Sequence, residues 1–307
     1  MVPRPLAPHL VLTAGVIVVS TASILIRFAQ GEGVPSLTIA AIRLGLAALI
    51  LTPIVWAQSS HELRGLHRRD LALALLSGVF LAVHFWSWIA SLAYTSVASS
   101  TALVTTNPLW VGLASVLILG ERLSRRIVAG IVLTLAGGVL IFASDGSSPS
   151  AAIHPNPLGG NLLALLGAVA ASGYLLVGRA LRGRLGLLTY IWLAYGSAAV
   201  LLLLGTAATE QSLAGYSRLA YAAMLGLALG PQLLGHTALN WALRHLSATF
   251  VAVSILGEPI GSALLALLIF GEHFAALQLA GFALLLVGIY LAARGEQPAP
   301  SAARTGH

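Results

Sequence analysis

The residues of this sequence that could do chemistry are polar side chains set inside long apolar stretches. The clearest is Glu258, which lies between Gly257 and Pro259 near the middle of an apolar stretch from Ser247 to Phe270. A carboxylate in a segment long enough to cross a bilayer is costly, and the adjacent proline removes a backbone donor. Both are tolerated where the segment faces protein or a water-filled cavity. Glu258 is therefore expected either to bond a neighbouring helix and hold a bundle together, or to line a pathway for a solute or a proton.

A second proline interrupts an apolar stretch at Asn107-Pro108. A proline leaves the carbonyl oxygen four residues earlier without its helical partner, which is that of Val104 for Pro108 and that of Ile255 for Pro259. Such carbonyls can accept a hydrogen bond from a ligand ammonium or from water, and the Asn107 amide can both donate and accept. The two prolines are therefore candidate hinges beside a binding site, with a purely structural kink as the alternative.

Two further sets of residues share helix faces. His84 and Trp88 are four residues apart, and Gln232, His236 and Asn240 recur every four residues. A polar stripe of three residues facing lipid would be severely unfavourable, so this stripe is expected to face the interior of a bundle. Both sets could contribute to a binding site.

Arg43 also lies within an apolar stretch. It could pair with Glu258, bind a solute carboxylate, or extend its long side chain toward the membrane surface. Tyr190, Trp192 and Tyr195 gather near one end of their segment, which is typical of residues at a membrane interface. We expect these three to belong to an interfacial belt rather than to a binding site.

The composition indicates a membrane protein that crosses the bilayer many times. Of its 307 residues, 58% are hydrophobic and only 8% are charged, and the mean hydropathy is +0.93; a soluble domain has far more charge. The formal charge of +7 comes from short basic runs between apolar segments, a pattern that sets membrane orientation rather than one that binds nucleic acid. The chain has no cysteine, no phosphate-binding loop and no His-Glu-x-x-His motif. It is therefore not expected to be an enzyme, and no metal site is predicted.

Apolar segments make up most of the chain, and most are close to the roughly 20 residues that a spanning helix needs. Their approximate bounds are 9–28, 36–56, 70–92, 97–119, 127–143, 158–181, 187–206, 218–241, 247–270 and 275–293. These ten segments predict an all-α membrane protein with ten transmembrane helices. The longest break carries Asp-Gly-Ser-Ser-Pro and Pro-Asn-Pro, which are typical of a linker. The predicted organisation is a first five-helix repeat over 1–143, an external linker over 144–157, a second five-helix repeat over 158–294 and a disordered cytoplasmic tail over 295–307.

The arginines predict the orientation of the helices. Most of them occur in the N-terminus, in the C-terminus and in the connections after the even-numbered segments, although Arg27 and Arg218 flank two of the other connections. The connections after the odd-numbered segments carry acidic residues instead, namely Glu32, Asp145, Glu210 and Glu272. By the positive-inside rule both termini are expected to be cytoplasmic, and the acidic connections external.

The two halves of the sequence repeat. Asn107-Pro108 matches Glu258-Pro259 at an offset of 151 residues. Further pairs recur at an offset of 151 or 152, and these are Glu121 with Glu272, Gly130 with Gly281, Gly137 with Gly288, Ser20 with Ser172 and Arg27 with Arg179. Matching glycines could serve helix packing alone. Because each repeat has an odd number of spans, the second is predicted to be inverted relative to the first, an arrangement that in transporters places a binding site near the membrane midplane.

With these motifs the sequence resembles the drug/metabolite transporter superfamily, specifically its EamA-type ten-helix exporters, over about residues 10 to 293. The motifs that carry the resemblance are Ser20 to Arg27, Arg43, Thr95-Ser96-Val97-Ala98 leading to Asn107-Pro108, Gly120-Glu121, Ser254 to Pro259 and Gly271-Glu272. Within the superfamily it is most similar to the YddG-type exporters of aromatic and other neutral amino acids. The resemblance implies a bacterial inner-membrane protein without a bound cofactor. Segments 1–4 and 6–9 would surround a central cavity, and segments 5 and 10 would brace it from outside.

The expected function is export of small metabolites, above all amino acids including aromatic ones, by alternating access. The expected partners are the small-molecule substrate, the lipid bilayer and a candidate proton that would be carried on Glu258 alone; no nucleic acid is expected, and a monomer is compatible with the sequence. The alternatives are a drug or nucleotide-precursor carrier on the same fold, a lipid-linked flippase, and a non-transporting membrane sensor or assembly subunit. The predicted substrate-binding residues are His84, Trp88, Asn107, Trp110, Tyr174, His236, Asn240 and Glu258, and the predicted hinges are Pro108 and Pro259.

Overall fold

The computed structural model describes residues 7–107, 109–111, 113–114, 124–147, 155–181, 184–242, 254–255 and 257–295. Over these residues the chain consists of helices and turns, with no strand, which confirms the predicted all-α fold. The helices are α1 (Ala7–Ser20), α2 (Ala22–Gly31), α3 (Ser36–Arg64), α4 (Arg68–Ser91), α5 (Val97–Val104), α7 (Arg125–Ser147), α8 (Pro157–Leu181), α9 (Leu187–Ala208), α10 (Arg218–Leu227), the π-helix η2 (Ala228–Gly235), α11 (His236–Ala242), α13 (Gly257–Phe270) and α14 (Ala276–Gly295).

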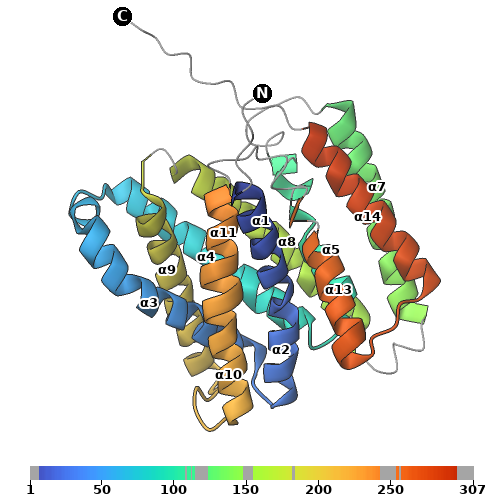
Figure 1. The fold of residues 1–307 in the computed structure, drawn as a ribbon, viewed down its shortest axis with the longest axis horizontal. Coiled ribbons are helices and arrows are strands. Elements are labelled where there is room, and N and C mark those ends of the chain that lie inside the picture. The colour runs from blue at the N-terminus through green and yellow to red at the C-terminus, as the bar shows by residue number, and fades with distance from the viewer. Residues whose placement is uncertain are drawn as a thin grey trace, which may run out of the picture.

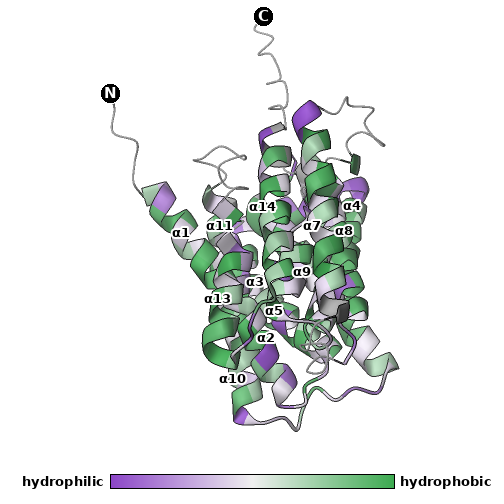
Figure 2. Cartoon of the chain, turned by 90° about the vertical axis from the view of Figure 1, so that its right-hand side faces the viewer, coloured by the Kyte–Doolittle hydropathy of each residue, from purple (hydrophilic) through white to green (hydrophobic). Residues whose placement is uncertain are grey.

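The helices have the length and the apolar surface of membrane spans. Within the described residues, seven helical segments are long and apolar enough to cross a membrane, and α13 and α14 contain two shorter apolar helices. With α5, which lies in the fourth predicted segment, they account for all ten predicted segments. Hydrophobic residues cover most of the length of these helices (Figure 2), and Leu49, Val139 and Leu268 are among many that are largely exposed. An apolar surface of this extent suits a lipid environment rather than water.

Each main packing pair joins one segment from each half of the chain. The first segment, α1 and α2, packs against the eighth, which comprises α10, η2 and α11. Four further pairs are α3 with α9, α4 with α8, α5 with α13, and α7 with α14, and α4 also contacts α9. When each segment of the five pairs is replaced by its counterpart in the other half, the same five pairs result. This is expected for inverted repeats related by a two-fold axis.

The two-fold relation extends to single residues between α7 and α14, which lie side by side at one edge of the bundle (Figure 1). A Cβ atom at Gly137 would come 2.6 Å from the carbonyl oxygen of Gly281, and one at Gly288 would come 2.7 Å from that of Gly130. The repeat matches Gly130 with Gly281 and Gly137 with Gly288, so each contact is the image of the other. These glycines therefore let two backbones approach closely, and α7 and α14 are the fifth and tenth segments, which the resemblance places outside the cavity.

Both ends of the described chain lie at one end of the bundle. α1 begins and α14 ends there, whereas α2 and α13 run toward the opposite end (Figure 1). An even number of spans requires this arrangement. Following the predicted orientation, we call the end where α1 begins the internal end and the opposite end the external end.

The first predicted segment is not a single helix, because it is divided at Thr21 into α1 and α2. Ser20 Oγ donates to the carbonyl oxygen of Val16 at 2.8 Å, and Thr21 Oγ1 donates to that of Val18 at 2.7 Å. Hydroxyl groups that bond back to the preceding turn bend a helix. α3 and α7 also extend beyond their predicted ends at residues 56 and 143, since they continue to Arg64 and Ser147.

The eighth predicted segment contains a π-helix. The N–H of His236 donates to the carbonyl oxygen of Pro231, five residues earlier, at the end of η2. Pro231 has no N–H for the α-helical ladder, which gives a local reason for the wider turn. Short π-helical insertions are frequent at functional sites, and this one carries Gln232 of the polar stripe.

Candidate functional site

Arg43, on α3, lies at the centre of the candidate site and has no exposed surface. Its Nε donates to Gln232 Oε1 at 2.9 Å, and its Nη1 is buried without a hydrogen-bond partner. The Arg43 and Glu258 charges are close enough to interact, yet no ion pair joins them among the described residues. Burial excludes extension of Arg43 to the membrane surface, and a direct pair with Glu258 is not formed. Of the three predicted uses of Arg43, the binding of a solute carboxylate stays a prediction.

Two rings of α4 lie near the Arg43 guanidinium, and a third stacks on one of them. Its Cζ is 4.1 Å from the ring centroid of Phe85 and 5.9 Å from that of Trp88, distances that allow cation–π attraction. His84 and Trp88 stack with their centroids 6.1 Å apart and their planes at 12°, as their spacing predicts. Trp88 Nε1 is a second buried donor without a partner.

The position of His84 determines which of its nitrogens can accept. His84 Nδ1 lies 2.9 Å from the carbonyl oxygen of Gly167 on α8. Because a carbonyl oxygen only accepts, Nδ1 carries the proton, and Nε2 of the neutral ring is an acceptor. His84 therefore complements the donors of Arg43 and Trp88.

The polar stripe of the eighth segment faces this cluster. Gln232 is buried against Arg43, and the His236 ring makes an edge contact with Phe85 at a centroid distance of 6.5 Å. The prediction that the stripe faces the interior is confirmed for these two residues. Asn240 belongs to α11, but its side chain lies outside the described residues.

The predicted interfacial belt is wrong for Tyr190 and Tyr195, which are both buried. The Tyr195 hydroxyl interacts with Gln232, and the Tyr190 hydroxyl lies 2.7 Å from Ser77 Oγ. The reason is tertiary, because α9 packs against α3 and α4 and directs these rings into the bundle. Tyr190 also stacks on Tyr174 of α8, with centroids 5.9 Å apart.

Glu258 and Pro259 lie in the first turn of α13, the helix that packs against α1 and α5. A Cβ atom at Gly261 would come 2.5 Å from Ser20 Oγ, so this glycine allows α13 to approach α1. The Glu258 side chain is partly exposed.

Asn107 serves the backbone of its own helix. Its amide is oriented so that the nitrogen faces the carbonyl oxygens of Val104 and Thr105, each at 3.1 Å, since the reverse orientation would oppose acceptor to acceptor. The Val104 carbonyl is the one that loses its helical partner to Pro108. The carbonyl oxygen of Asn107 in turn accepts from Ser172 Oγ at 3.1 Å. Pro108 lies outside the described residues, so both predicted hinges, Pro108 and Pro259, stay predictions.

Two of the predicted aromatic ligands make other contacts. Trp110 Nε1 donates to Thr106 Oγ1 at 3.1 Å within its own turn. Tyr174 stacks on Tyr190 and lies seven residues from Gly167, about 10 Å along α8. The structure therefore brings His84, Trp88 and His236 together and places these two rings in different surroundings.

Besides Arg43, for which ligand binding was one of three alternatives, three residues of the cluster were not predicted as ligands: Phe85, Gln232 and Tyr195. Gln232 was identifiable from its place in the polar stripe. Phe85 is an apolar residue in an apolar segment, so nothing in the sequence separates it from the lipid-facing residues around it. Tyr195 becomes a site residue only through the packing of α9.

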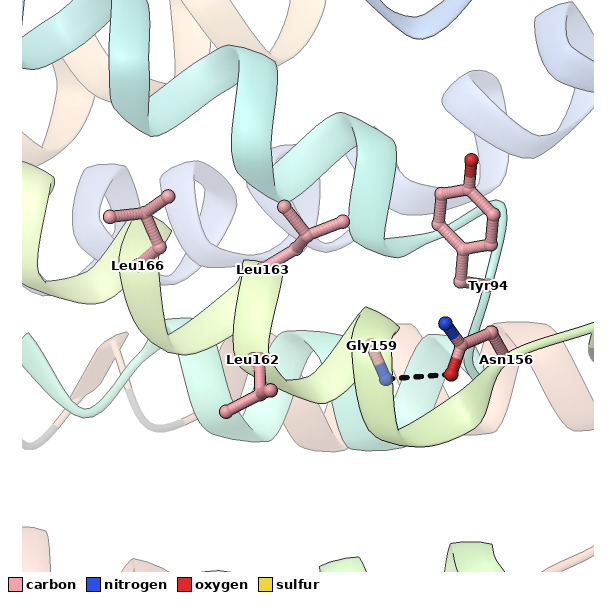
Figure 3. Close-up of a pocket in the computed structure, with 6 residues that line it drawn as sticks. All are labelled: Tyr94, Asn156, Gly159, Leu162, Leu163 and Leu166. Atoms are coloured by element: carbon pink, nitrogen blue, oxygen red, sulfur yellow. Dashed lines mark hydrogen bonds between the residues drawn. The ribbon is translucent and has the colours of Figure 1, made fainter.

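A separate groove runs along the exposed side of α8 and is lined by Tyr94, Asn156, Gly159, Leu162, Leu163 and Leu166 (Figure 3). Asn156 Oδ1 accepts from the Gly159 N–H at 3.0 Å, which caps the start of α8. Leu162 and Leu166 are exposed. With no charged side chain in its lining, this groove suits lipid rather than a polar solute.

The cluster around Arg43 has the groups needed to hold a zwitterion. Arg43 Nη1 and Trp88 Nε1 are donors for an anionic group, and His84 Nε2 and the Glu258 carboxylate are acceptors for a cationic one. The rings of Phe85 and Trp88 offer apolar surface. Within the described residues, no group of three or more His, Asp or Glu side chains could hold a metal ion.

Comparison with known proteins identifies a family for both halves of the chain. The sequence model of the EamA-like transporter family matches residues 7–143 and again residues 158–294. A search of the curated proteins found no match. The chain is also similar to a solved crystal structure, with 20% sequence identity, a TM-score of 0.64, and coverage of 93% of this chain and 96% of the other. At that identity the similarity shows the fold alone.

Proposed function

Because the chain belongs to the EamA-like transporter family, a family of membrane transporters of small molecules, we propose that it exports neutral amino acids, including aromatic ones, by alternating access. The proposal places it in the bacterial inner membrane with both termini in the cytoplasm. It includes assignment to the YddG-type exporters and a substrate site within the cluster around Arg43.

The observation that carries the proposal is the state of Arg43. A guanidinium with no exposed surface keeps one nitrogen, Nη1, without a partner, and the neighbouring Trp88 Nε1 is also unpartnered. Leaving a buried donor unsatisfied costs about 1–3 kcal/mol, and more for a charged group. A substrate carboxylate would satisfy both donors, and charge-assisted bonds of this kind are among the stronger ones in proteins.

The rest of the cluster fits the other parts of an amino acid. The Glu258 carboxylate and His84 Nε2 would accept from the ammonium group. The side chain of the substrate would pack against the rings of Phe85 and Trp88, which attract aromatic rings through offset or edge contacts. Arg43 belongs to the first half and Gln232, which orients it, to the second, so the site lies where the repeats meet.

The test is counterflow in proteoliposomes preloaded with unlabelled amino acids. Labelled tryptophan, phenylalanine, threonine or glutamate is then offered outside. We expect accumulation of the neutral amino acids and little of glutamate, because Glu258 faces the bound ligand. Absence of accumulation for all four, in sealed vesicles with folded protein, contradicts the proposal.

Variants assign the two ends of the substrate. Arg43→Gln is expected to lower tryptophan counterflow roughly 10- to 100-fold, the worth of a charge-assisted hydrogen bond. Arg64→Gln is the matched control, because Arg64 is exposed at the end of the same helix. Tryptophanamide, which lacks the carboxylate, should compete poorly with tryptophan in the wild type.

Glu258→Gln should reduce the flux of tryptophan while the protein stays monodisperse. A normal flux in this variant would remove Glu258 from the mechanism.

A further inference from the structure

At the external end, Glu272 connects three parts of the chain. It lies between α13 and α14, and its Oε1 is 3.0 Å from Arg27 Nη2 of α2. Its Oε2 accepts from the backbone N–H of Val97 at 2.9 Å. The same Arg27 nitrogen donates to the carbonyl oxygen of Thr95 at 2.9 Å. One carboxylate and one guanidinium therefore join the first segment, the connection before the fourth segment and the connection after the ninth.

The Glu272 carboxylate also caps a helix of the other half. Val97 is the first residue of α5, and the preceding Ser96 side chain accepts from the N–H of Ser99. The first N–H groups of a helix lack intrahelical acceptors and carry its positive end, so a carboxylate is favoured there. Burial raises the pKa of the Glu272 carboxyl, while the Arg27 charge and the Val97 N–H oppose that rise. Both partners therefore favour the charged form of the carboxyl group.

An apolar contact lies beside this polar one. Phe28 of α2 and Phe270 at the end of α13 pack with their ring centroids 5.4 Å apart. The Arg27 and Glu272 side chains are only 20% and 13% exposed, so their interaction is largely shielded from water. Shielding strengthens the attraction between the two charges relative to a surface pair.

We propose that the Arg27–Glu272 pair is a latch that keeps the external end closed and must break each time the carrier opens to the outside. Alternating access requires elements from the two repeats to separate at one end of the site at a time. Arg27 and Val97 belong to the first repeat and Glu272 to the second, so that separation breaks both contacts of the carboxylate. The latch rests on the alternating-access part of the proposed function and does not depend on the substrate.

The absence of cysteine from the sequence provides a clean assay. Ser23→Cys is the reporter, because Ser23 is fully buried on α2 one turn before Arg27, and its hydroxyl has no hydrogen-bond partner. A membrane-impermeant thiol reagent is added on the external side of sealed vesicles. We expect Glu272→Gln to raise the labelling rate roughly five- to tenfold. Arg27→Gln should do the same, and the double variant should add little, because the two residues act as one pair.

Two further variants make the test decisive. Glu32→Gln removes an exposed carboxylate at the same end and should leave labelling unchanged. Val97→Pro removes the N–H that Glu272 accepts while it keeps every charge, at a first helical position where proline is well tolerated. It should raise labelling about twofold. Wild-type rates in both Glu272→Gln and Val97→Pro would overturn the latch, as would an equal rise in Glu32→Gln. Because the labelling assay needs no substrate, it tests the latch even if the amino-acid counterflow experiment fails.

Discussion

The Asn107 amide nitrogen lies within hydrogen-bonding distance of two backbone carbonyl oxygens of its own turn. A proline at position 108 has no N–H to offer the carbonyl of Val104, and the Asn107 nitrogen lies 3.1 Å from that oxygen and 3.1 Å from the oxygen of Thr105. The equivalent residue of the second half, Glu258, has only acceptors when ionised and cannot make such bonds. The two positions therefore match in sequence but differ in chemistry.

This difference predicts that Asn107→Ala lowers stability rather than affinity. Loss of the amide leaves two buried carbonyls without their donor, which costs about 1–3 kcal/mol for each buried group left unsatisfied. We expect a lower melting temperature in detergent and an unchanged tryptophan Kd. Asn107→Asp keeps the shape but has no donor, so it should be at least as destabilising. Weaker binding at an unchanged melting temperature would instead support a substrate contact.

At the residue scale, Arg43 shows how a charge can be kept inside a membrane bundle. The guanidinium lies over the Phe85 ring, is oriented by Gln232 and interacts with the Glu258 charge at longer range. These contacts offset part of the cost of burial, although Nη1 keeps no hydrogen-bond partner. A buried charge without such support would be strongly unfavourable.

At the scale of elements, the α7–α14 pair depends on glycines. Gly137 faces the backbone of α14, where a Cβ atom would come within 2.6 Å of the Gly281 carbonyl oxygen and 2.7 Å of the Leu285 nitrogen. Backbone atoms of a packed helix cannot move aside without separating the two helices.

Gly137→Ala is therefore expected to destabilise the protein by about 1–3 kcal/mol, the usual cost of overpacking. The matched control is Gly138→Ala on the same helix, because a Cβ atom there meets only Leu103 Cδ2 at 3.9 Å. Both variants gain the same helix propensity, so the difference between their melting temperatures isolates the contact with α14. Equal melting temperatures would show that α7 and α14 can separate without cost.

The π-helix η2 decides which residues of its segment reach the site. A regular α-helix would bring the fourth residue after Gln232 onto the same face, and the wider turn at Pro231 shifts this register slightly. Gln232 still meets Arg43, and His236 meets Phe85 on α4. With this register, the side chains of Gln232 and His236 contact neighbouring residues of the cluster around Arg43.

At the scale of the whole molecule, every main packing pair joins the two repeats, so the halves are built to exchange roles. Glu121 and Arg179 match Glu272 and Arg27 in the sequence repeat and belong to the predicted internal end. Glu121 and the Arg179 side chain lie outside the described residues, so a second pair between them is a prediction from the repeat alone.

If the halves exchange roles, Glu121→Gln should favour the conformation closed to the outside. With the Ser23→Cys reporter we expect external labelling to fall roughly two- to fivefold, the opposite of the effect of Glu272→Gln. Labelling that rises in both variants would show that the two ends do not alternate.

The membrane character, the all-α fold with its ten segments and the inverted repeat could all be predicted from the sequence. These follow from the length, apolar content and spacing of single segments, each of which must satisfy its own backbone hydrogen bonds in lipid. It also singled out His84, Trp88 and the polar stripe, because polar groups on one helix face must avoid lipid. The burial of Tyr195, the position of Arg43 over Phe85 and the pairing of Arg27 with Glu272 become visible only in the folded protein. Such contacts join residues up to 245 positions apart, and they depend on how helices pack rather than on any local pattern.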